Sequence, residues 1–201
     1  MSIETKTLKE AIRERRSIHS LTKKAGVDQA YLDKIIETVR YAPSAFNMQS
    51  TRMVVLLNEK HEQFWDMVTK TLEAVTPAEH FPSTLEKMQG FKGGNGTILF
   101  FEDQAVVEGY MEQAPLYASN FPGWSLQGDA IMQYAMWLSL TSEGFGVSIQ
   151  HYNPLIDNQV QEMYGVPGNW TLIAQMPFGE PNNTPGEKTF LPLDDVVTFV
   201  Q

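Results

Sequence analysis

Apolar residues recur at helical spacing in several stretches of the chain, and short continuous apolar runs lie between these stretches. Thr7 and Glu10 have the spacing of a capping box and predict a first helix that runs to about Arg16. The next amphipathic stretch predicts a second helix that begins after Asp28. This helix should end before Pro43, because a proline disfavours helical backbone in the residue that precedes it.

After the second helix, a polar loop over residues 44–49 leads into alternating runs of strand length and stretches of helix length. The predicted strands cover residues 53–57, 97–101, 147–150 and 171–176. Two of the predicted helices begin at Asn58 and at Ser83, and each of these residues is expected to cap its helix. Three further helices are predicted over residues 105–117, 124–143 and 154–165. Strands that alternate with helices predict an α+β fold, an α/β layered sheet. Neither a repeat nor a linker divides the sequence, so residues 1–201 are predicted to form one domain.

The helix predicted over residues 124–143 is apolar almost all round. Such a helix must be buried on most of its sides, and a subunit interface is one way to bury the surplus in so small a protein. The tail, residues 194–201, is apolar enough to form a strand, and it is too long to be expected to remain without a packing partner.

The composition excludes several classes of chemistry. The chain has no cysteine, so it has no disulfide, no Cys-ligated zinc or iron–sulfur site and no thiolate catalysis. No apolar run approaches the roughly 20 residues of a membrane span, and the polar start lacks the apolar core of a signal peptide. These features predict a cytoplasmic protein with no membrane partner. The net charge of -9 argues against a nucleic-acid partner, because nucleic-acid binding needs a basic surface.

The basic residues are unevenly distributed along the chain. Residues 93–201 contain one base, Lys188, against 12 acidic residues, whereas the rest of the chain contains 14 of the 15 bases. An anion-binding site would therefore use Lys188 or the cluster Arg13, Arg15 and Arg16. Serine-hydrolase, zinc-protease and phosphate-loop motifs are missing, and the four histidines are scattered, so no metal site is predicted. An enzyme with these features would leave the demanding chemistry to a cofactor.

Two polar segments stand out, each at the end of a predicted helix. They read Arg15-Arg16-Ser17-Ile18-His19 and Pro43-Ser44-Ala45-Phe46-Asn47-Met48-Gln49. Taken alone, the first would be favourable charge at a helix C-terminus and the second a polar loop. In this order, and with the late Lys188, they resemble the flavin site of the nitroreductase family, the FMN-dependent NAD(P)H oxidoreductases. The length and the run Gln49-Ser50-Thr51-Arg52 are similar to the short subgroup of fungal fatty-acid-repression proteins and bacterial copper-induced nitroreductases.

The resemblance implies that the first segment and the late lysine hold the phosphate and the ring of FMN. Arg15 and Arg16 offer planar charged forks, Ser17 adds a hydroxyl, and Lys188 supplies a second positive charge. The family often has an arginine two residues after this lysine, where this chain has Phe190.

The resemblance also implies that Ser44, Asn47 and Gln49 contact the flavin, partly across a dimer interface. On the residues alone, Asn47 and Gln49 could instead cap backbone groups nearby. The strand that ends at Gln150 and His151 corresponds to the family segment at the reactive edge of the ring, where a backbone N–H directed at N5 would stabilise negative charge. No catalytic side chain is assigned. The residues expected to bind the cofactor are Arg15, Arg16, Ser17, His19, Ser44, Asn47, Gln49, Gln150, His151 and Lys188.

The family resemblance implies a nitroreductase-like fold, with a central mixed sheet flanked by helices and a C-terminal strand exchanged in a homodimer. NADH or NADPH would deliver a hydride to N5 of the flavin, and a nitroaromatic or quinone would then take two electrons in the same slot, in ping-pong order. Phe46, Trp124 and Tyr152 are candidates for shaping that slot. Two other interpretations stay open. One is a flavin-binding regulatory or stress-response protein with weak turnover, in lipid signalling or metal stress, and the other is a nucleotide-binding module without flavin.

Overall fold

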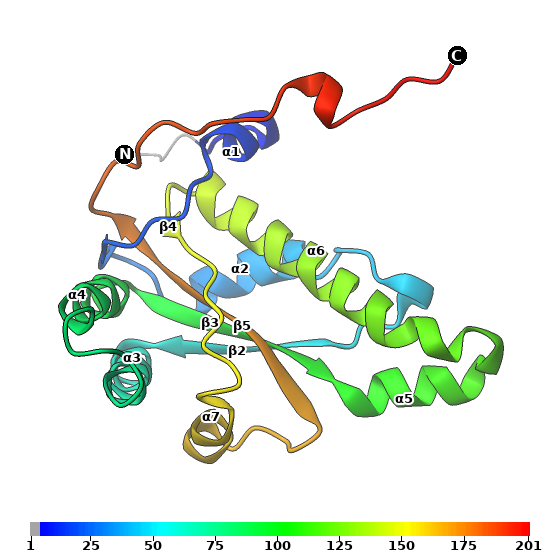
Figure 1. Ribbon diagram of the computed structural model, residues 1–201, viewed down its shortest axis with the longest axis horizontal. Coiled ribbons are helices and arrows are strands. Elements are labelled where there is room, and N and C mark those ends of the chain that lie inside the picture. Colours follow the sequence, from blue (N-terminus) through cyan, green and yellow to red (C-terminus); the bar gives the residue numbers. More distant parts are fainter. Residues whose placement is uncertain (1–4) are drawn as a thin grey trace.

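An antiparallel sheet forms the centre of the molecule in the computed structural model, which describes residues 5–201 (Figure 1). The strands run in the order β1-β5-β3-β2, and β4 also pairs with β5. Their bounds are β1 Leu21–Thr22, β2 Thr51–Leu57, β3 Gly96–Asp103, β4 Gly146–Val147 and β5 Trp170–Pro181. The central pair, β3 and β5, is in register from Gly96 opposite Phe178 to Asp103 opposite Trp170, with one register shift between Phe100 and Phe101.

Helices cover both faces of this sheet (Figure 1). The helices in residues 5–201 are α1 Leu8–Glu14, α2 Gln29–Val39, α3 Asn58–Glu73, α4 Phe81–Lys92, α5 Gln104–Gln113, α6 Phe121–Ser142 and α7 Asp157–Tyr164. One face is covered by α3, α4 and α7, and the other by α2 and α6. The short helix α1 packs on α6, and α5 lies with the start of α6 beyond the end of β3 (Figure 1).

Side chains of β3 alternate between two apolar cores, and all of its residues are buried. Ile98 and Phe100 pack with α2 and α6, whereas Leu99 and Phe101 pack with α3, α4 and α7. A strand that is covered on both faces has no need for polar alternation, which explains the continuous apolar run in its sequence. The sheet is therefore the middle layer of three.

A smaller apolar cluster joins the start of α6 to the loop that follows α2. This loop contains a short 3-10 helix, η1 Ala45–Asn47. Its Met48 is buried against Val107 of α5 and Phe121 of α6. The cluster fixes the loop at the end of the molecule where α6 begins.

The structure confirms the predicted starts of the first two helices. Thr7 and Glu10 form the capping box of α1. The Asp28 side chain accepts a hydrogen bond of 2.8 Å from the Tyr31 amide at the start of α2. Both capping interactions join residues within four positions of each other in the chain. They therefore form independently of where the helix packs in the fold.

The predicted capping role of Asn58 and the predicted helix start at Ser83 are wrong. The helix α3 does begin at Asn58, but Asn58 is its first residue and does not cap it, and its backbone adopts the left-handed region with φ 51°, which asparagine tolerates. The helix α4 begins at Phe81, before Ser83, with Pro82 in its first turn. A proline there is already in helical conformation and lacks the amide that would need a cap.

Most predicted elements in the second half have different lengths in the structure. The helix predicted over residues 105–117 is α5, which ends at Gln113, and the helix predicted over residues 124–143 is α6, which begins at Phe121. The strand predicted over residues 147–150 is limited to β4 and a single bridge between Gln150 and Gln175. The helix predicted from residue 154 begins at Asp157, and it stops at Gly165 as predicted, where the glycine adopts the left-handed conformation. The last predicted strand continues to Pro181 as β5, because its end also pairs with β1 and β4.

The tail does not form the strand predicted over residues 194–201. It forms a 3-10 turn, η3 Leu193–Asp195, and then runs past α1 and away from the sheet (Figure 1). Its apolar side chains are left exposed, with Phe199 at 81% and Val200 at 94%. The tail meets no open strand edge of its own chain, and its exchange into a partner's sheet stays a prediction.

The predicted α+β layered fold is confirmed. The named strands pair antiparallel, and the mixed character of the sheet is limited to one parallel bridge between Ser17 and Val147. Within the described part of the chain, the helices are too short or too polar to cross a membrane.

Candidate functional site

The segment that follows α1 is fixed against β4. Ser17 and Val147 form a parallel bridge, and the Ile18 amide donates to the Val147 carbonyl at 3.0 Å. Arg15 lies on α6, with its Cζ 4.3 Å from the centre of the Trp137 ring. The ring orients the guanidinium, and its planar donor fork is thereby preset for an anion. Sequence reasoning missed Trp137, because the all-round apolar pattern of α6 does not show which of its rings meets a charge.

Arg16 connects the same segment to the chain near the late lysine. Its Nη1 donates to the carbonyl of Gly186, two residues before Lys188. Arg16 also lines a cavity of about 310 Å³ next to the end of α6. Lys188 itself is exposed, and its Nζ lies 5.1 Å from the centre of the Phe190 ring. The structure thus brings Arg16 next to the chain that precedes Lys188, and leaves the lysine side chain exposed.

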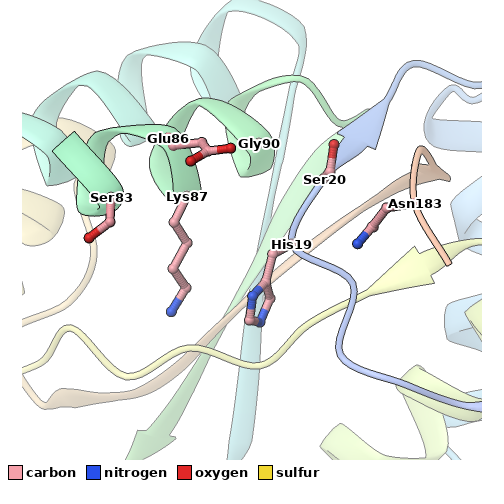
Figure 2. Close-up of a pocket in the computed structure, with 7 residues that line it drawn as sticks. All are labelled: His19, Ser20, Ser83, Glu86, Lys87, Gly90 and Asn183. Carbon is pink, nitrogen blue, oxygen red and sulfur yellow. The ribbon is translucent and has the colours of Figure 1, made fainter. Parts of the chain in front are cut away.

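A second cavity, of about 400 Å³, lies between α4 and the segment that contains His19 and Ser20 (Figure 2). His19 and Lys87 extend into it from opposite walls, and Asn183 borders it (Figure 2). Burial lowers the pKa of Lys87, and burial together with the charge of Lys87 lowers the pKa of His19. Imidazole and ammonium can both donate hydrogen bonds to a carbonyl or an anion here. Lys87 was missed, since on its helix it reads as an ordinary surface lysine.

The shape of this cavity depends on a close approach between α4 and the backbone of His19. A Cβ atom added at Gly90 would lie 2.1 Å from the His19 carbonyl oxygen. We expect Gly90→Ala to push α4 away and to lower the free energy of unfolding by about 1–3 kcal/mol. Gly109→Ala in α5 is the matched control, because nothing lies within 4 Å of its added Cβ. The control should raise the free energy of unfolding by about 0.5–1 kcal/mol. Urea unfolding measures both variants, and a Gly90→Ala variant as stable as the control would contradict the close approach.

The loop from Ser44 to Gln49 is held in a strained backbone conformation. Phe46, Asn47 and Gln49 have φ values of 56°, 53° and 50°. The left-handed region costs a residue with a side chain about 1–2 kcal/mol. Ser44 Oγ accepts a hydrogen bond of 3.0 Å from the Gln49 amide and so closes the loop. Strain concentrated in this way is typical of ligand-binding loops.

Arg52, at the start of β2, binds the last residue of this loop. Its Nη1 donates to the Gln49 carbonyl at 2.7 Å, and its Nη2 lies 3.0 Å from Asp103 Oδ2. Asp103 Oδ1 in turn accepts a hydrogen bond of 2.7 Å from Asn169. The loop is therefore anchored to two strands by a charged pair that no sequence pattern predicted.

The two predicted groups of flavin residues lie at different positions along α6. An added Cβ at Gly128 would lie 3.3 Å from Ser44 Cβ, so the loop packs there, whereas Arg15 stacks on Trp137. Nine residues along the helix correspond to about 14 Å at a rise of about 1.5 Å per residue. A single chain therefore does not bring Ser44 and Arg15 into contact.

The segment at Gln150 crosses the sheet and leaves one amide free. Gln150 and Gln175 exchange backbone hydrogen bonds of 2.8 and 2.9 Å, and the Tyr152 amide donates to Gln175 Oε1 at 2.8 Å. The amide of His151, between them, donates to no acceptor within residues 5–201, and His151 is exposed. The family resemblance implies an N–H directed at the flavin in this segment, and that role stays a prediction.

Aromatic rings gather where the loop meets the start of α6. Phe46 stacks on Trp124, with 5.9 Å between ring centres and 22° between ring planes. Its ring centre also lies 5.4 Å from that of Phe121 and 6.0 Å from that of Tyr117. Phe46 is 55% exposed, so the group offers an open face to a flat ligand. Tyr152, the third aromatic residue predicted here, packs instead against the core next to α3 and α7.

Comparison with known proteins matches most of the chain to one family. The model of the Nitroreductase family matches residues 12–180, a range that contains every predicted flavin residue except Lys188. HBN1 of Saccharomyces cerevisiae is 34% identical over 164 residues, which cover 81% of this chain and 81% of HBN1. The nitroreductase FRM2 of the same yeast is 30% identical over 186 residues, 90% of this chain and 91% of FRM2.

Solved structures have the same fold. Nitroreductase CinD from Lactococcus lactis in complex with chloramphenicol superposes with a TM-score of 0.88 at 38% identity, covering 97% of this chain and 100% of CinD. CinD in complex with 4-nitrophenol gives a TM-score of 0.87. A protein from Exiguobacterium sibiricum in complex with FMN is similar in fold alone, with a TM-score of 0.77 at 16% identity, covering 99% of this chain and 100% of that protein.

Proposed function

Since the chain belongs to the nitroreductase family, we propose that it is an FMN-dependent oxidoreductase that passes two electrons from NADH or NADPH to a nitroaromatic or a quinone. The observation that carries the proposal is the row of donors after α1. Arg15 is preset on Trp137, and His19 shares a cavity of about 400 Å³ with Lys87. The proposal assigns the protein to the cytoplasm, where both reductants are available.

The residues present fit FMN in charge and in chemical type. A phosphate dianion needs charged donors, and Arg15 and Arg16 would hold it with guanidinium forks, assisted by the Ser17 hydroxyl. The carbonyl oxygens of the flavin ring need hydrogen-bond donors, and His19 and Lys87 would supply them from the cavity between α4 and the segment after α1. Lys188 would add positive charge if its ammonium turns from Phe190 to the phosphate.

Bound FMN would supply the redox chemistry, accepting a hydride from the nicotinamide and passing two electrons to the acceptor. The free His151 amide would donate a hydrogen bond to the ring nitrogen that takes the hydride and would stabilise the negative charge there. Gln150 and Tyr152, whose own amides are bonded to Gln175, hold that amide in place. Solvent would supply the protons, so no acidic side chain is required.

Phe46 and Trp124 would form one wall of the substrate slot. Their stacked rings present a flat apolar surface, and a further aromatic ring stacked on it gains about 0.5–1.5 kcal/mol beyond area burial. The choice of a nitroaromatic is supported by CinD, which has been solved with 4-nitrophenol and with chloramphenicol.

The proposal includes a homodimer. Ser44 and Arg15 are about 14 Å apart along α6 in one chain, so two chains would supply them to one flavin. Strand β2 is the open edge of the sheet, and a groove of about 290 Å³, lined in part by Val55 and Leu57, runs beside it. The exposed tail would cover this edge as an added strand of the partner.

The tail provides a test of the dimer. We expect simultaneous replacement of Val197 and Phe199 by lysine to shift the protein from dimer to monomer, because alternate residues of an added strand face the same side. Thr198→Lys is the matched control, since residue 198 would face the opposite side, and it should remain dimeric. Sedimentation at several protein concentrations measures the difference. A dimer of unchanged strength in the double variant would contradict strand exchange.

The absorption spectrum of the purified protein tests the proposed function. Flavin bands should be present or appear on adding FMN, bleach with NADH or NADPH in the absence of oxygen, and return on adding a nitroarene or quinone. A colourless protein that does not take up FMN would contradict the proposal. A protein that binds FMN but passes no electrons to either acceptor would be a flavin-binding protein instead.

A further inference from the structure

His151 lies in the segment that joins β4 to α7 (Figure 1). The side chains on either side of it are bonded to each other, because the Tyr152 hydroxyl donates to Gln150 Oε1 at 3.2 Å. Gln150 Nε2 in turn donates to Ser148 Oγ at 2.8 Å. Residues 148, 150 and 152 therefore turn their side chains to one side of the segment. Successive side chains of an extended chain point to opposite sides, so the imidazole of His151 lies on the other side, where it is exposed.

The backbone amide of His151 points to an open edge. The Gln150 amide donates to the Gln175 carbonyl at 2.8 Å, and the Tyr152 amide donates to Gln175 Oε1 at 2.8 Å. Both neighbouring amides are thus directed at β5. Amides alternate in direction along an extended chain, so the His151 amide points away from β5, where it meets no acceptor within residues 5–201. The residue offers a backbone donor and an imidazole that are both free.

These two groups of His151 cannot lie far apart. Three bonds separate the amide nitrogen from the ring, so both ring nitrogens lie within about 6 Å of that amide. A hydrogen bond from the amide to N5 of the flavin would span about 3 Å. An acceptor that takes a hydride lies about 3–3.5 Å from the atom that gives it. The imidazole therefore reaches the polar atoms of an acceptor that lies over N5.

The other three histidines are placed differently. His61 has 0% exposure, and both of its ring nitrogens lie at hydrogen-bond distance from partners in the core. His19 shares its cavity with Lys87, and His80 directly precedes α4. His151 is the histidine that lies in the segment to which the proposed function assigns the reactive edge of the flavin. Imidazole gains and loses a proton near neutral pH, which suits it for proton transfer.

We propose that the imidazole of His151 passes a proton to the electron acceptor while the acceptor takes a hydride from the reduced flavin. With a quinone, the hydride and the proton convert it to the hydroquinone. With a nitro group, they leave together with one oxygen as water, and a nitroso group remains. The exposed ring then regains its proton from water, which stays the source of the proton. This catalytic role of the side chain rests on the proposed function, which uses the amide of the same residue.

The choice of acceptor separates proton transfer from electron transfer. Ferricyanide takes electrons without a proton, whereas a quinone needs a proton with its hydride. His151→Gln keeps the backbone amide, so FMN should bind and its bands should bleach with NADH. The variant should reduce a quinone about 100-fold more slowly than the parent, as for the loss of a general acid, and should not show this loss with ferricyanide. His80→Gln removes another exposed histidine and is the matched control, which should follow the parent with both acceptors.

Two further readouts exclude a merely structural role. In His151→Ala, imidazole added to the solution should restore quinone reduction in proportion to its concentration, because it replaces the missing ring. In the oxidised protein without reductant, where no turnover takes place, the ring ¹⁵N signals of His151 should shift when a nitroarene is added. Those of His80 should stay unchanged. These signals come from the parent protein, so they also decide the question if both variants fail to fold.

The outcomes distinguish this proposal from the proposed function. Equal rates of quinone reduction in the parent and in His151→Gln would overturn the catalytic role of the imidazole. A loss of equal size with ferricyanide would do the same, since it would place the defect in electron transfer. Ring signals of His151 that ignore the nitroarene would show that the ring does not touch the acceptor. A parent protein that takes up no FMN, or that reduces neither a quinone nor ferricyanide, would overturn the proposed function and the role of His151 with it.

Discussion

Replacing Arg15 by alanine is expected to weaken the binding of FMN by about 10- to 150-fold. Losing one hydrogen-bonded contact to a charged group costs roughly 1.5–3 kcal/mol, and about 1.4 kcal/mol corresponds to a factor of ten. The side chain is already oriented by the Trp137 ring at 4.3 Å, so little conformational entropy is lost when an anion binds. Arg16 compensates only in part, since Nη1 of its guanidinium already donates to the Gly186 carbonyl. Quenching of flavin fluorescence during titration measures the affinity.

Arg13→Ala is the matched control for this experiment. Arg13 lies in the last turn of the same helix and is exposed, so the variant loses the same charge without losing the stacked position. We expect its affinity for FMN to stay within about twofold of the parent, as for a screened surface charge. Arg15→Lys should fall between the two, because it keeps the charge and loses the planar fork. Equal losses in Arg13→Ala and Arg15→Ala would contradict a specific role for Arg15.

Signals that act over a few residues predicted the fold well. The capping box at Thr7, the cap at Asp28 and the helix stop at Gly165 depend on local backbone geometry, and all three are confirmed. Elements decided by pairing across the sheet were not predictable in this way. Strand β1 has two residues and exists only because Leu21 and Thr22 meet the end of β5. The tail has an apolar pattern that suits a strand, but a strand requires a neighbouring strand to pair with, and within residues 5–201 the tail pairs with none.

The candidate site was predictable in composition and much less so in arrangement. Chemical type and order along the chain selected the segments of Arg15 and Ser44, and their binding of FMN stays a prediction. The positions of Lys87 next to His19 and of Trp137 next to Arg15 were not foreseeable. Lys87 and Trp137 are ordinary members of helical patterns until α4 and α6 are packed on the sheet. The strain at residues 46–49 was equally hidden, since only one of these four residues, Asn47, is of a type that favours the left-handed region.

Two buried groups are expected to change the stability of the protein in opposite directions between pH 4 and pH 7. His61 has 0% exposure, and its ring nitrogens lie 2.9 Å from Thr97 Oγ1 and 3.1 Å from the Lys92 carbonyl oxygen. Burial lowers its pKa from 6.5 to about 4. As the pH falls below 6.5, the unfolded chain takes up a proton that the folded chain refuses, so stability is lost until about pH 4. At about 1.4 kcal/mol per pH unit, the loss is roughly 3 kcal/mol.

Asp129 has the opposite effect, because burial raises its pKa from 3.8 to about 7. The folded chain keeps a proton that the unfolded chain releases, so this group destabilises the fold increasingly as the pH rises from about 4 to 7. Asp129→Asn should therefore be more stable than the parent by roughly 3–4 kcal/mol at pH 8, and the two should be equal near pH 4. The variant should also reveal the acid sensitivity of His61, which the parent masks. Urea unfolding at several pH values measures both effects, with Glu112→Gln as the surface control. A difference between variant and parent that is the same at every pH would mean that Asp129 does not titrate in this range.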